Sequence, residues 1–246
     1  MSATESKYVE KKIEMPATMI ERAEKSHPGV TFKNEADWLR CVKDDFPKFI
    51  PFLTKHCALA IRGRVLEIGA GSGWFSAELS KLPLVVEIVT TDVSAKLLKN
   101  EAPKIFKLLR ANESKITRTP ADFEKLDFPA NHFHAVVCSD ALHQSAHIPR
   151  VLREVKRVLK PNGTFIAIRE PVRPFVKLKP RRGKASESVE LPGCALSEYR
   201  DYFEAAGLKL TVKRVVLSRG VKYYFDKVVN GFTHARYAFV ATKSVK

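Results

Sequence analysis

Residues 64–73, with the sequence Arg-Val-Leu-Glu-Ile-Gly-Ala-Gly-Ser-Gly, constrain the fold of this chain more than any other stretch. The apolar run at its start predicts a buried strand, and three alternating glycines (Gly69, Gly71 and Gly73) follow at once. From Trp74 onward, apolar residues recur at helical spacing. We therefore expect a strand, a glycine turn and a helix whose free N–H groups face the turn. Glycines there would let a ligand approach the main chain without meeting a Cβ atom.

The spacing of the glycines argues against a dinucleotide site. The dinucleotide-binding fingerprint is G-x-G-x-x-G, and its third glycine lets the helix pack closely. Here that position holds the bulky Trp74, and the observed pattern is G-x-G-x-G preceded by Glu67. This pattern resembles the first motif of class I S-adenosylmethionine-dependent methyltransferases, whose cofactor has no pyrophosphate. A dehydrogenase is disfavoured for the same reason.

Strand and helix patterns alternate from residue 64 onward, which is typical of a parallel sheet with helices on both faces. Strands are expected over 65–68, 85–91, 116–121, 134–139, 164–169, 208–217 and 236–242. With the family resemblance, the predicted fold is α/β: a Rossmann-like, doubly wound, seven-stranded sheet. It is expected to be mostly parallel, with an antiparallel last strand.

Several helix boundaries are predicted from capping residues. Asn34, Ser94 and Ser197 are each placed to cap a following helix. Pro103 is expected to kink or break the helix that Ser94 begins. The turn at 161–163, Pro-Asn-Gly, should end an amphipathic helix that starts at about residue 148.

We expect residues 1–60 to form a helical N-terminal cap or lid, and residues 61–246 to form the methyltransferase core. In the family, leading helices often cover the cofactor, but a cap that only shields the sheet fits the pattern equally well. Trp38 is expected in the core, with a pocket wall as the alternative. Residues 171–196 are rich in proline and basic residues and predict a long insertion after the fifth strand.

Acidic residues at the ends of the second and third expected strands strengthen the resemblance. Asp92 lies 19 residues beyond Gly73, close to the interval of about 20 residues at which a carboxylate reaches ribose hydroxyls. The alternative interpretation of Asp92 is a helix cap at the end of a strand. In the family, the acid and the apolar residue that end the third strand, here Asp122 and Phe123, contact the adenine amino group and ring.

The resemblance is to the type 11 branch of the family and spans residues 64–170. It implies S-adenosyl-L-methionine as cofactor and S-adenosyl-L-homocysteine as product. The cofactor site that it implies consists of Glu67, Gly69, Ala70, Gly71, Gly73, Asp92, Val93, Asp122, Phe123 and Ser139. Two residues depart from the family pattern: His134 replaces an aspartate, and Asn162 replaces a glycine. Both departures concern packing, and asparagine suits position 162 because it tolerates a left-handed backbone.

Residues just past the fourth and fifth strands should face the methyl acceptor, because ligands bind beyond the carboxyl ends of such strands. His143 is the candidate general base, since a histidine titrates close to neutral pH. A hydrogen-bonded structural histidine is the alternative. Glu170 is the second candidate catalytic residue, which would orient the acceptor or bind a cationic group. Its alternative role is a helix cap or an ion pair.

Charge and cysteine usage limit the partners. The 246-residue chain has a formal net charge of +16, and the basic excess is greatest in residues 171–246. This favours an anionic partner, although basic residues that merely solvate a surface explain it as well. The four cysteines form no C-x-x-C pair, so we expect no metal site and a cytoplasmic protein with reduced thiols. No apolar run approaches the roughly 18 residues of a membrane span.

Three hypotheses for the function remain open. The first is methyl transfer to oxygen or nitrogen of a small molecule, including an anionic, lipid-linked or sugar-linked one. The second is methylation of RNA or protein through the basic C-terminal third, although the basic run lacks interleaved aromatic residues. The third is a cofactor-binding regulator without activity. The segment after the fourth strand carries neither the Asn/Asp-Pro-Pro-Tyr/Phe motif nor the Pro-Cys nucleophile of nucleobase methyltransferases.

Overall fold

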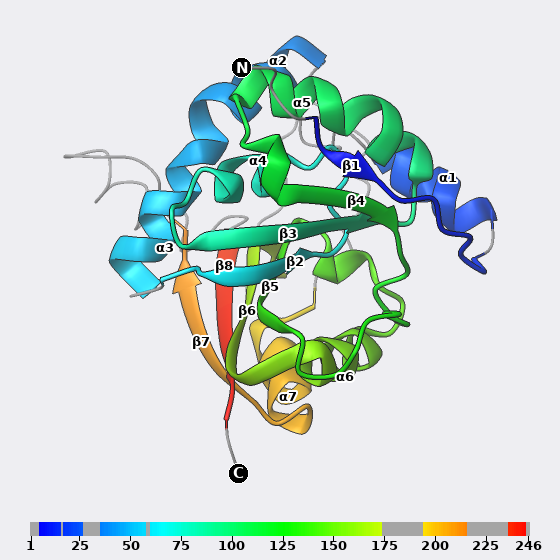
Figure 1. The fold of residues 1–246 in the computed structure, drawn as a ribbon. Coiled ribbons are helices and arrows are strands. Elements are labelled where there is room, and N and C mark those ends of the chain that lie inside the picture. Colours follow the sequence, from blue (N-terminus) through cyan, green and yellow to red (C-terminus); the bar gives the residue numbers. More distant parts are fainter. Residues whose placement is uncertain are drawn as a thin grey trace, which may run out of the picture.

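The structure is a computed structural model that describes residues 5–15, 17–26, 35–57, 60–173, 194–215 and 236–244. Within these ranges, eight strands form one sheet in the order β1-β4-β3-β2-β5-β6-β8-β7 (Figure 1). The strands are β1 (Lys7–Tyr8), β2 (Gly63–Glu67), β3 (Val85–Asp92), β4 (Ile116–Pro120), β5 (Phe133–Ser139), β6 (Leu159–Pro171), β7 (Leu208–Arg214) and β8 (Arg236–Lys243).

The strand order places a topological switch point at the centre of the sheet. β2, β3 and β4 follow one another toward one edge, and β5 then pairs with the other side of β2. The pairs from β1 to β6 are parallel, and β8 runs antiparallel to both β6 and β7. The predicted mostly parallel sheet with an antiparallel last strand is confirmed. In open sheets of this kind, a ligand binds beyond the carboxyl ends of the strands at the switch point.

The sheet has one strand more than the seven that the sequence predicts. The additional strand, β1, pairs in parallel with β4 at the edge of the sheet. The preceding Ser6 donates its N–H and its hydroxyl to Glu113, and Arg118 Nη2 donates to the Ser6 carbonyl oxygen at 2.9 Å. A pairing of two residues has no periodicity of its own, which is why the segment 1–60 was expected to contain no strand.

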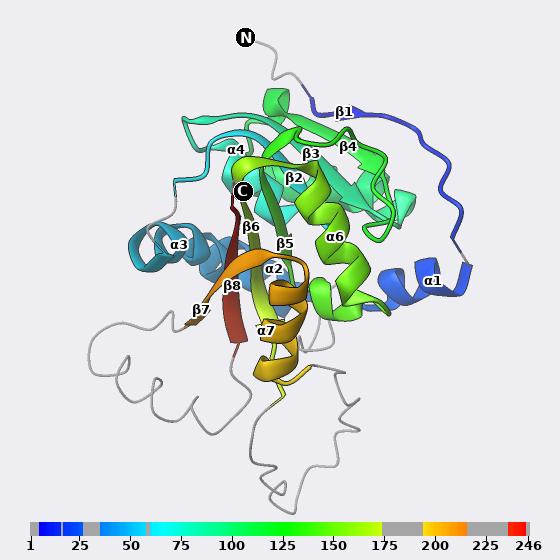
Figure 2. The ribbon, with the colours of Figure 1, turned by 90° about the horizontal axis from the view of Figure 1, so that it is seen from below.

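Helices cover both faces of the sheet, as predicted (Figure 1, Figure 2). One face carries α2 (Glu35–Arg40), α3 (Phe49–Cys57), α4 (Trp74–Ser80) and α5 (Ala102–Leu109), and the other carries α6 (Ile148–Val158) and α7 (Leu196–Ala205). Neighbouring residues of one strand enter opposite layers, since Val65 packs into the first and Leu66 into the second. Burial on both faces explains why the strands read as apolar runs.

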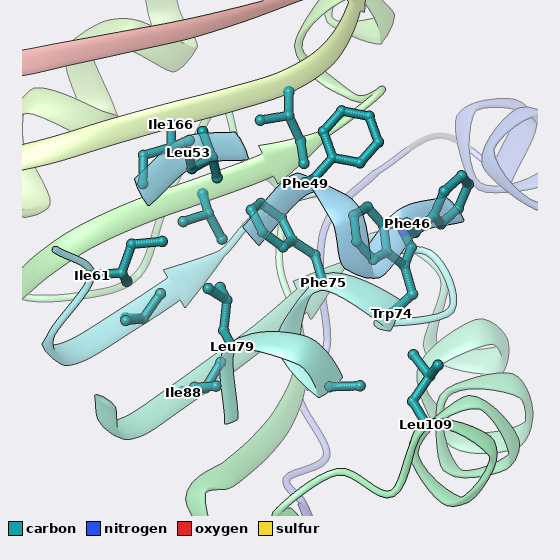
Figure 3. Packing of buried hydrophobic residues seen from close by; sticks show 14 of the residues in the cluster. Phe46, Phe49, Leu53, Ile61, Trp74, Phe75, Leu79, Ile88, Leu109 and Ile166 are labelled. Atoms are coloured by element: carbon teal, nitrogen blue, oxygen red, sulfur yellow. The ribbon is translucent and has the colours of Figure 1, made fainter. Parts of the chain in front are cut away.

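The segment from α2 to α3 is part of the hydrophobic core of the first layer. Its short links are η1 (Cys41–Asp45) and η2 (Phe46–Lys48). The Phe46 ring lies 5.3 Å from the Trp38 ring and 4.6 Å from the Trp74 ring, and Phe49 packs beside them (Figure 3). Trp38 is 6% exposed and is a core aromatic, as expected. These contacts also explain the bulky Trp74 at the position of the missing glycine.

The first helix, α1 (Ala17–Ser26), lies beside the carboxyl end of β3. Glu24 Oε1 accepts a hydrogen bond from the Ser94 hydroxyl at 2.8 Å, and Glu24 Oε2 pairs with Lys96 at 3.3 Å. Ser94 follows β3 after a single intervening residue. The contact therefore fixes α1 next to Asp92, the last residue of that strand.

Of the three predicted helix caps, one is confirmed, one is wrong and one lies outside the described residues. Ser94 is confirmed, because its hydroxyl accepts the Leu97 N–H at 3.2 Å. The prediction for Ser197 is wrong: α7 begins one residue earlier, and the Glu198 carboxylate accepts the N–H of Ala195, the residue before the helix. A glutamate in the first turn thus replaces the serine as the capping group. Asn34 lies outside the described residues.

The other predicted breaks agree with the structure. After η3 (Leu97–Glu101), α5 begins at Ala102 and has Pro103 in its first turn, so the proline marks the break that was expected there. Asn162 lies in the first part of β6, which begins directly after α6, and has a φ of 60°, the left-handed conformation that asparagine tolerates. The replacement of a glycine at this position is therefore accommodated by the backbone.

Part of the predicted domain organisation lies outside the described residues. This applies to 174–193 and thus to most of the insertion predicted over 171–196, including its basic run from Lys177 to Lys184. The division at residue 60 stays a prediction. In the described part of the chain, residues 35–57 share a hydrophobic layer with α4 and α5.

Candidate functional site

The glycine turn after β2 has the backbone conformation that its sequence predicts. Gly69, Gly71 and Gly73 have φ angles of 60°, 54° and 73°, which L side chains rarely adopt. A Cβ atom added at Gly69 would lie 2.7 Å from the Ala141 Cβ and 3.5 Å from the Phe123 ring. The structure therefore brings together the ends of β2, β4 and β5 at this turn, and only a glycine at position 69 allows this close approach.

Asp92, at the end of β3, is joined to the glycine turn by a hydrogen bond. The Gly71 N–H donates to its Oδ2 at 2.7 Å, and the Ser94 N–H donates to its Oδ1 at 2.9 Å. Burial raises the pKa of Asp92, although bonds from the backbone N–H groups of Ser94, Gly71 and Val93 oppose this effect. The carboxylate thus caps the following turn, and it also lies against the bare main chain of the motif.

Glu67, the acid before the glycines, lies beneath the turn and is 1% exposed. Its Oε2 accepts hydrogen bonds from the Ser76 N–H at 3.0 Å and from the Ser76 hydroxyl, which Thr90 contacts in turn. Burial raises the pKa of Glu67 to about 8, against the opposing effect of the Ser76 bonds. Glu67 braces the start of α4 in this structure, and a direct contact with a cofactor stays a prediction.

The residues after β4 border the same turn. The Ala121 N–H donates to the Asp92 carbonyl oxygen at 3.0 Å and ties the end of β4 to that of β3. Asp122 is half-buried, and its Oδ1 accepts the Glu124 N–H at 2.8 Å. The half-buried Phe123 ring faces Gly69, as described above. An acid and an aromatic ring therefore follow β4 at the border of the glycine turn.

Two serines at the site have buried hydroxyls without a hydrogen-bond partner. They are Ser72, inside the glycine turn, and Ser139, the last residue of β5. A buried hydroxyl that lacks a partner is costly, so such groups call for an explanation. Here both flank the switch point between β2 and β5, where a polar ligand would be bound.

His143 and Glu170 form a buried pair at the ends of β5 and β6. His143 lies in the short turn η5 (Leu142–Gln144), and its Nδ1 is 2.9 Å from Glu170 Oε2. The Glu170 carboxylate also accepts the backbone N–H groups of Ala141, Leu142 and His143 at 3.0 to 3.2 Å. Glu170 is 0% exposed and His143 is 8% exposed.

The hydrogen bonds of this pair assign its protons. An ionised carboxylate only accepts, so His143 Nδ1 carries a proton and donates it to Glu170. The other ring nitrogen, Nε2, is then the basic atom. Burial lowers the pKa of His143, but the hydrogen bond and the charge of Glu170 outweigh it, and the pKa of His143 is raised. The sequence predicted both residues near the acceptor but did not predict their contact.

A charged cluster that the sequence did not predict lies beside this pair. Asp140 receives Arg169 Nη2 at 3.3 Å and Arg236 Nη1 at 2.8 Å. Arg169 is 5% exposed, and its guanidinium lies 4.2 Å from the centre of the Phe46 ring. Burial lowers the pKa of Arg169 to about 10. Arg236 is distant in the sequence from Asp140, and no local sequence pattern predicts that it lies at this site.

The described residues include neither a metal-binding cluster nor a helix that could span a membrane. They contain no group of three or more His, Cys, Asp and Glu side chains arranged to hold a metal ion. None of the helices among them has the length and apolarity that a membrane span requires. The four cysteines are free thiols, and Cys138 is buried inside β5.

Residues 66–167 match a protein family described as a methyltransferase domain. The matched segment runs from β2 into β6. It contains the glycine turn, Asp92, Asp122 and Ser139, whereas Glu170 lies beyond it.

A curated relative and two solved structures are similar to this chain. The ubiquinone/menaquinone biosynthesis C-methyltransferase UbiE of Pseudomonas aeruginosa (strain LESB58) is 34% identical over 106 residues, which are 43% of this chain and 41% of that protein. This chain therefore spans less than half the length of that relative.

The solved structures share the fold. Phosphoethanolamine N-methyltransferase 2 of Haemonchus contortus, in complex with phosphomonomethylethanolamine and S-adenosylhomocysteine, has a TM-score of 0.65 at 14% identity and covers 92% of this chain and 59% of its own. The [4+2]-cyclase SpnF has a TM-score of 0.60 at 18% identity and covers 87% of both chains. At such identities the likeness shows a common fold alone.

Proposed function

We propose that this chain is a class I S-adenosylmethionine-dependent methyltransferase that transfers a methyl group to a small-molecule acceptor, which the match of residues 66–167 to a methyltransferase-domain family supports. The observation that carries the proposal is the contact between the glycine turn and the carboxylate at the end of β3. The Gly71 N–H lies 2.7 Å from Asp92 Oδ2 at the switch point of the sheet. Bare main chain and a carboxylate thus meet where ligands bind in such sheets.

The residues of the site fit a sulfonium nucleoside. Gly69 lets the main chain of the turn approach Ala141 more closely than a Cβ atom would allow, and the Phe123 ring lies beside it. The buried hydroxyls of Ser72 and Ser139 lack partners that a polar ligand could supply. Asp92 would accept hydrogen bonds from the ribose hydroxyls, as the sequence predicts. The turn does not match the dinucleotide fingerprint, because Trp74 occupies the position of its third glycine and packs on Phe46.

Each part of the site would then hold one part of the cofactor. The main chain of the glycine turn, with Ala70, would border its amino-acid moiety. Asp92 and Val93 would hold the ribose, and Asp122 and Phe123 the adenine. When bound, S-adenosylmethionine supplies an electrophilic methyl group, and S-adenosylhomocysteine is the product after transfer.

His143 is the proposed general base for an acceptor that must lose a proton. Its Nε2 would take the proton of an acceptor hydroxyl or amine, while Nδ1 keeps its hydrogen bond to Glu170. Glu170 holds the tautomer and the ring in place and is a positioning residue, since its oxygens already accept four hydrogen bonds. This role replaces the direct contact with the acceptor that the sequence had suggested for Glu170.

The class of acceptor is part of the proposal. We favour oxygen or nitrogen of a small molecule, because a histidine held by a carboxylate suits removal of such a proton. The relative described above is named a C-methyltransferase. Transfer to carbon is therefore the alternative outcome, and product analysis would distinguish it from transfer to oxygen or nitrogen. The basic run that would serve RNA or protein lies outside the described residues, and cytoplasmic location stays a prediction.

Replacement of Asp92 by asparagine tests the cofactor site. Calorimetry of the full chain should show binding of S-adenosylmethionine and S-adenosylhomocysteine. Asp92→Asn should weaken both by about tenfold or more, since hydrogen bonds to charged groups contribute roughly 1.5–3 kcal/mol. The matched control is Glu87→Gln, which lies on the same strand, is exposed, and should leave binding unchanged.

Two results would contradict the proposal. One is heat from NAD but none from either sulfur nucleoside. The other is cofactor binding without transfer of a tritiated methyl group into any fraction of a cell extract, which would favour the regulator hypothesis. Transfer into the protein or RNA fraction, rather than the small-molecule or lipid fraction, would correct the acceptor class alone.

A further inference from the structure

The backbone is held in an unusual conformation at two neighbouring strand ends. Asp140, after β5, has a φ of 58°, and Arg169, near the end of β6, has a φ of 62°. Among the described residues, the other non-glycine residues with positive φ are Arg110, at the end of α5, and Asn131 and Asn162, and asparagine tolerates this region. Asp140 and Arg169 contact each other at 3.3 Å. Residues held in such conformations cluster at functional sites.

A bulge in β6 produces the conformation of Arg169. Ala167 pairs with Phe239 of β8, and Glu170 pairs with Tyr237, so β6 has one residue more than β8 in this interval. Such a bulge changes which face the following side chains occupy. As a result, Glu170 lies beneath the loop of His143, and Arg169 lies on the other face against Phe46.

The cluster contains two basic side chains at the carboxyl ends of β5 and β6. The guanidinium groups of Arg169 and Arg236 both contact the carboxylate of Asp140. Arg169 is buried, and the charge of Glu170 also acts on it. Glu170 is itself bound by the backbone N–H groups of the His143 loop, so Arg236 is the positive group of the cluster that reaches the surface.

The exposed part of the cluster is Arg236. Its side chain is 29% exposed, against 6% for Arg169. Its hydrogen bonds to described residues, to Asp140 Oδ1 at 2.8 Å and to the Arg169 carbonyl oxygen at 2.9 Å, both use Nη1. Within the described part of the chain, Nε and Nη2 make none. Two parallel N–H donors in one plane are the arrangement that binds a carboxylate or a phosphate group.

The cluster lies next to the proposed base. Asp140 precedes the turn of His143, Arg169 precedes Glu170, and the charges of Asp140 and Arg236 both act on the His143 ring. An acceptor whose reacting atom lies at His143 would thus have a second group within reach of Arg236. That group has to complement the positive charge and the free N–H donors of Arg236.

We propose that Arg236, held by Asp140 and backed by Arg169, binds an anionic group of the methyl acceptor, such as a carboxylate or a phosphate. This inference rests on the proposed function for the identity of the ligand as acceptor. Asp140 orients Arg236 through Nη1 and balances one of the two positive charges. The anion binds to the remaining donors of Arg236.

Anion binding is tested without any methyl transfer. The Nε–H signals of the full-length chain, labelled with ¹⁵N-arginine, are followed by NMR during titration with inorganic phosphate or acetate at constant ionic strength. The Arg236 signal, identified by its loss in Arg236→Gln, should shift saturably. A larger response to one anion separates a phosphate-bearing acceptor from a carboxylate-bearing one. Absence of a saturable shift with both anions would overturn the proposal.

Two variants with opposite effects separate a binding role from a structural one. Arg236→Gln should weaken anion binding about tenfold or more, as judged by the remaining shifts around the site. Asp140→Asn should tighten it, because it removes the competing negative charge, and asparagine tolerates the left-handed backbone. Arg153→Gln, on the exposed side of α6, is the control and should change nothing. Weaker binding in both cluster variants would indicate a purely structural cluster.

The enzymatic arm distinguishes this inference from the proposed function. Labelled product from extract should be retained by an anion exchanger, and Arg236→Gln should raise KM for that acceptor about tenfold while cofactor binding is unchanged. A neutral product with an unchanged KM would refute the anion site and leave methyl transfer intact. Absence of cofactor binding would refute the proposed function, whereas the NMR result would still decide whether the cluster binds anions.

Discussion

Asp92 and Glu170 are buried carboxylates that each accept backbone N–H groups from the loop of another strand. Asp92, on β3, binds the Gly71 N–H in the loop after β2, and Glu170, on β6, binds three N–H groups in the loop after β5. Charge-assisted bonds of this kind fix a loop more firmly than neutral ones. Their effect is to hold the glycine turn and the His143 turn in place on the two sides of the switch point.

The titration of His143 should depend on Glu170. The pKa of His143 is raised, so the neutral base forms only above the ordinary histidine value, and kcat/KM should fall with decreasing pH through that raised pKa. Glu170→Gln removes the carboxylate whose hydrogen bond and charge raise the pKa of His143. It leaves the burial of the ring, which lowers this pKa. The titration of the His143 ring, followed by NMR, should move to lower pH.

The same pKa shift predicts a pH-dependent stability. A raised folded-state pKa stabilises the fold fully below the unfolded value of about 6.5, and this contribution is lost as pH rises through the folded pKa. His132 and His134, whose pKa values are lowered mainly by burial, serve as internal controls. Unchanged titration of His143 in Glu170→Gln would contradict the pairing, and unchanged turnover in His143→Ala would remove its role as base.

At the scale of elements, α1 and the end of β3 form one unit. The contact between Glu24 and Ser94 joins the helix to the turn that follows Asp92, and the charge of Glu24 contributes to the raised pKa of Asp92. The sequence predicted the helical N-terminal segment and the cap at Ser94 separately. That the helix lies beside Asp92, the carboxylate proposed to hold the ribose, supports its proposed role as a cover.

Loss of this contact should speed release of the cofactor. Glu24→Gln weakens a hydrogen bond that contributes roughly 0.5–1.5 kcal/mol, so the dissociation rate of S-adenosylmethionine should rise roughly two- to tenfold in stopped-flow measurements. The melting temperature should change little, because the contact is near the surface. Glu35→Gln, in the exposed first turn of α2, is the matched control. Equal dissociation rates in the wild-type chain, Glu24→Gln and Glu35→Gln would show that α1 does not cover the site.

At the scale of the whole molecule, two parts of the N-terminal segment contact the sheet in different ways. Residues 5–26 pair with an edge strand and then reach the strand ends, whereas residues 35–57 fill the aromatic core between α4 and the sheet. The aromatic contacts of Phe46 and Phe49 with Trp74 cross the predicted boundary at residue 60. We therefore expect residues 35–57 and the core to unfold together.

Substitution of Phe49 tests this expectation. Phe49 is 4% exposed, and its ring lies 6.2 Å from that of Trp74. Phe49→Ala should lower the free energy of unfolding by about 3–5 kcal/mol in a single cooperative urea transition. Leu39→Ala, at an exposed position of α2, should cost far less. A separate early transition in the wild-type chain, or a loss below about 1 kcal/mol for Phe49→Ala, would indicate an independent cap.

Much of the fold and half of the site follow from local sequence. The strand, glycine turn and helix at 64–80 were predicted together, as were the strand ends at Asp92 and Asp122, because each depends on turn chemistry and periodicity within a short window. The cap of α7 was misassigned because serine and glutamate both serve at helix starts, and only the backbone decides between them.

What the sequence by itself determined is the order of the elements, the doubly wound sheet and the position of the cofactor motif. Only the tertiary structure decided the partners of Glu170 and the approach of Arg236 to Asp140, which are 96 residues apart in the chain. The physical reason is register: one extra residue in β6 determines which face Arg169 and Glu170 occupy. Apolar periodicity specifies a strand, but it does not specify a single bulge or the edge pairing of two residues at β1.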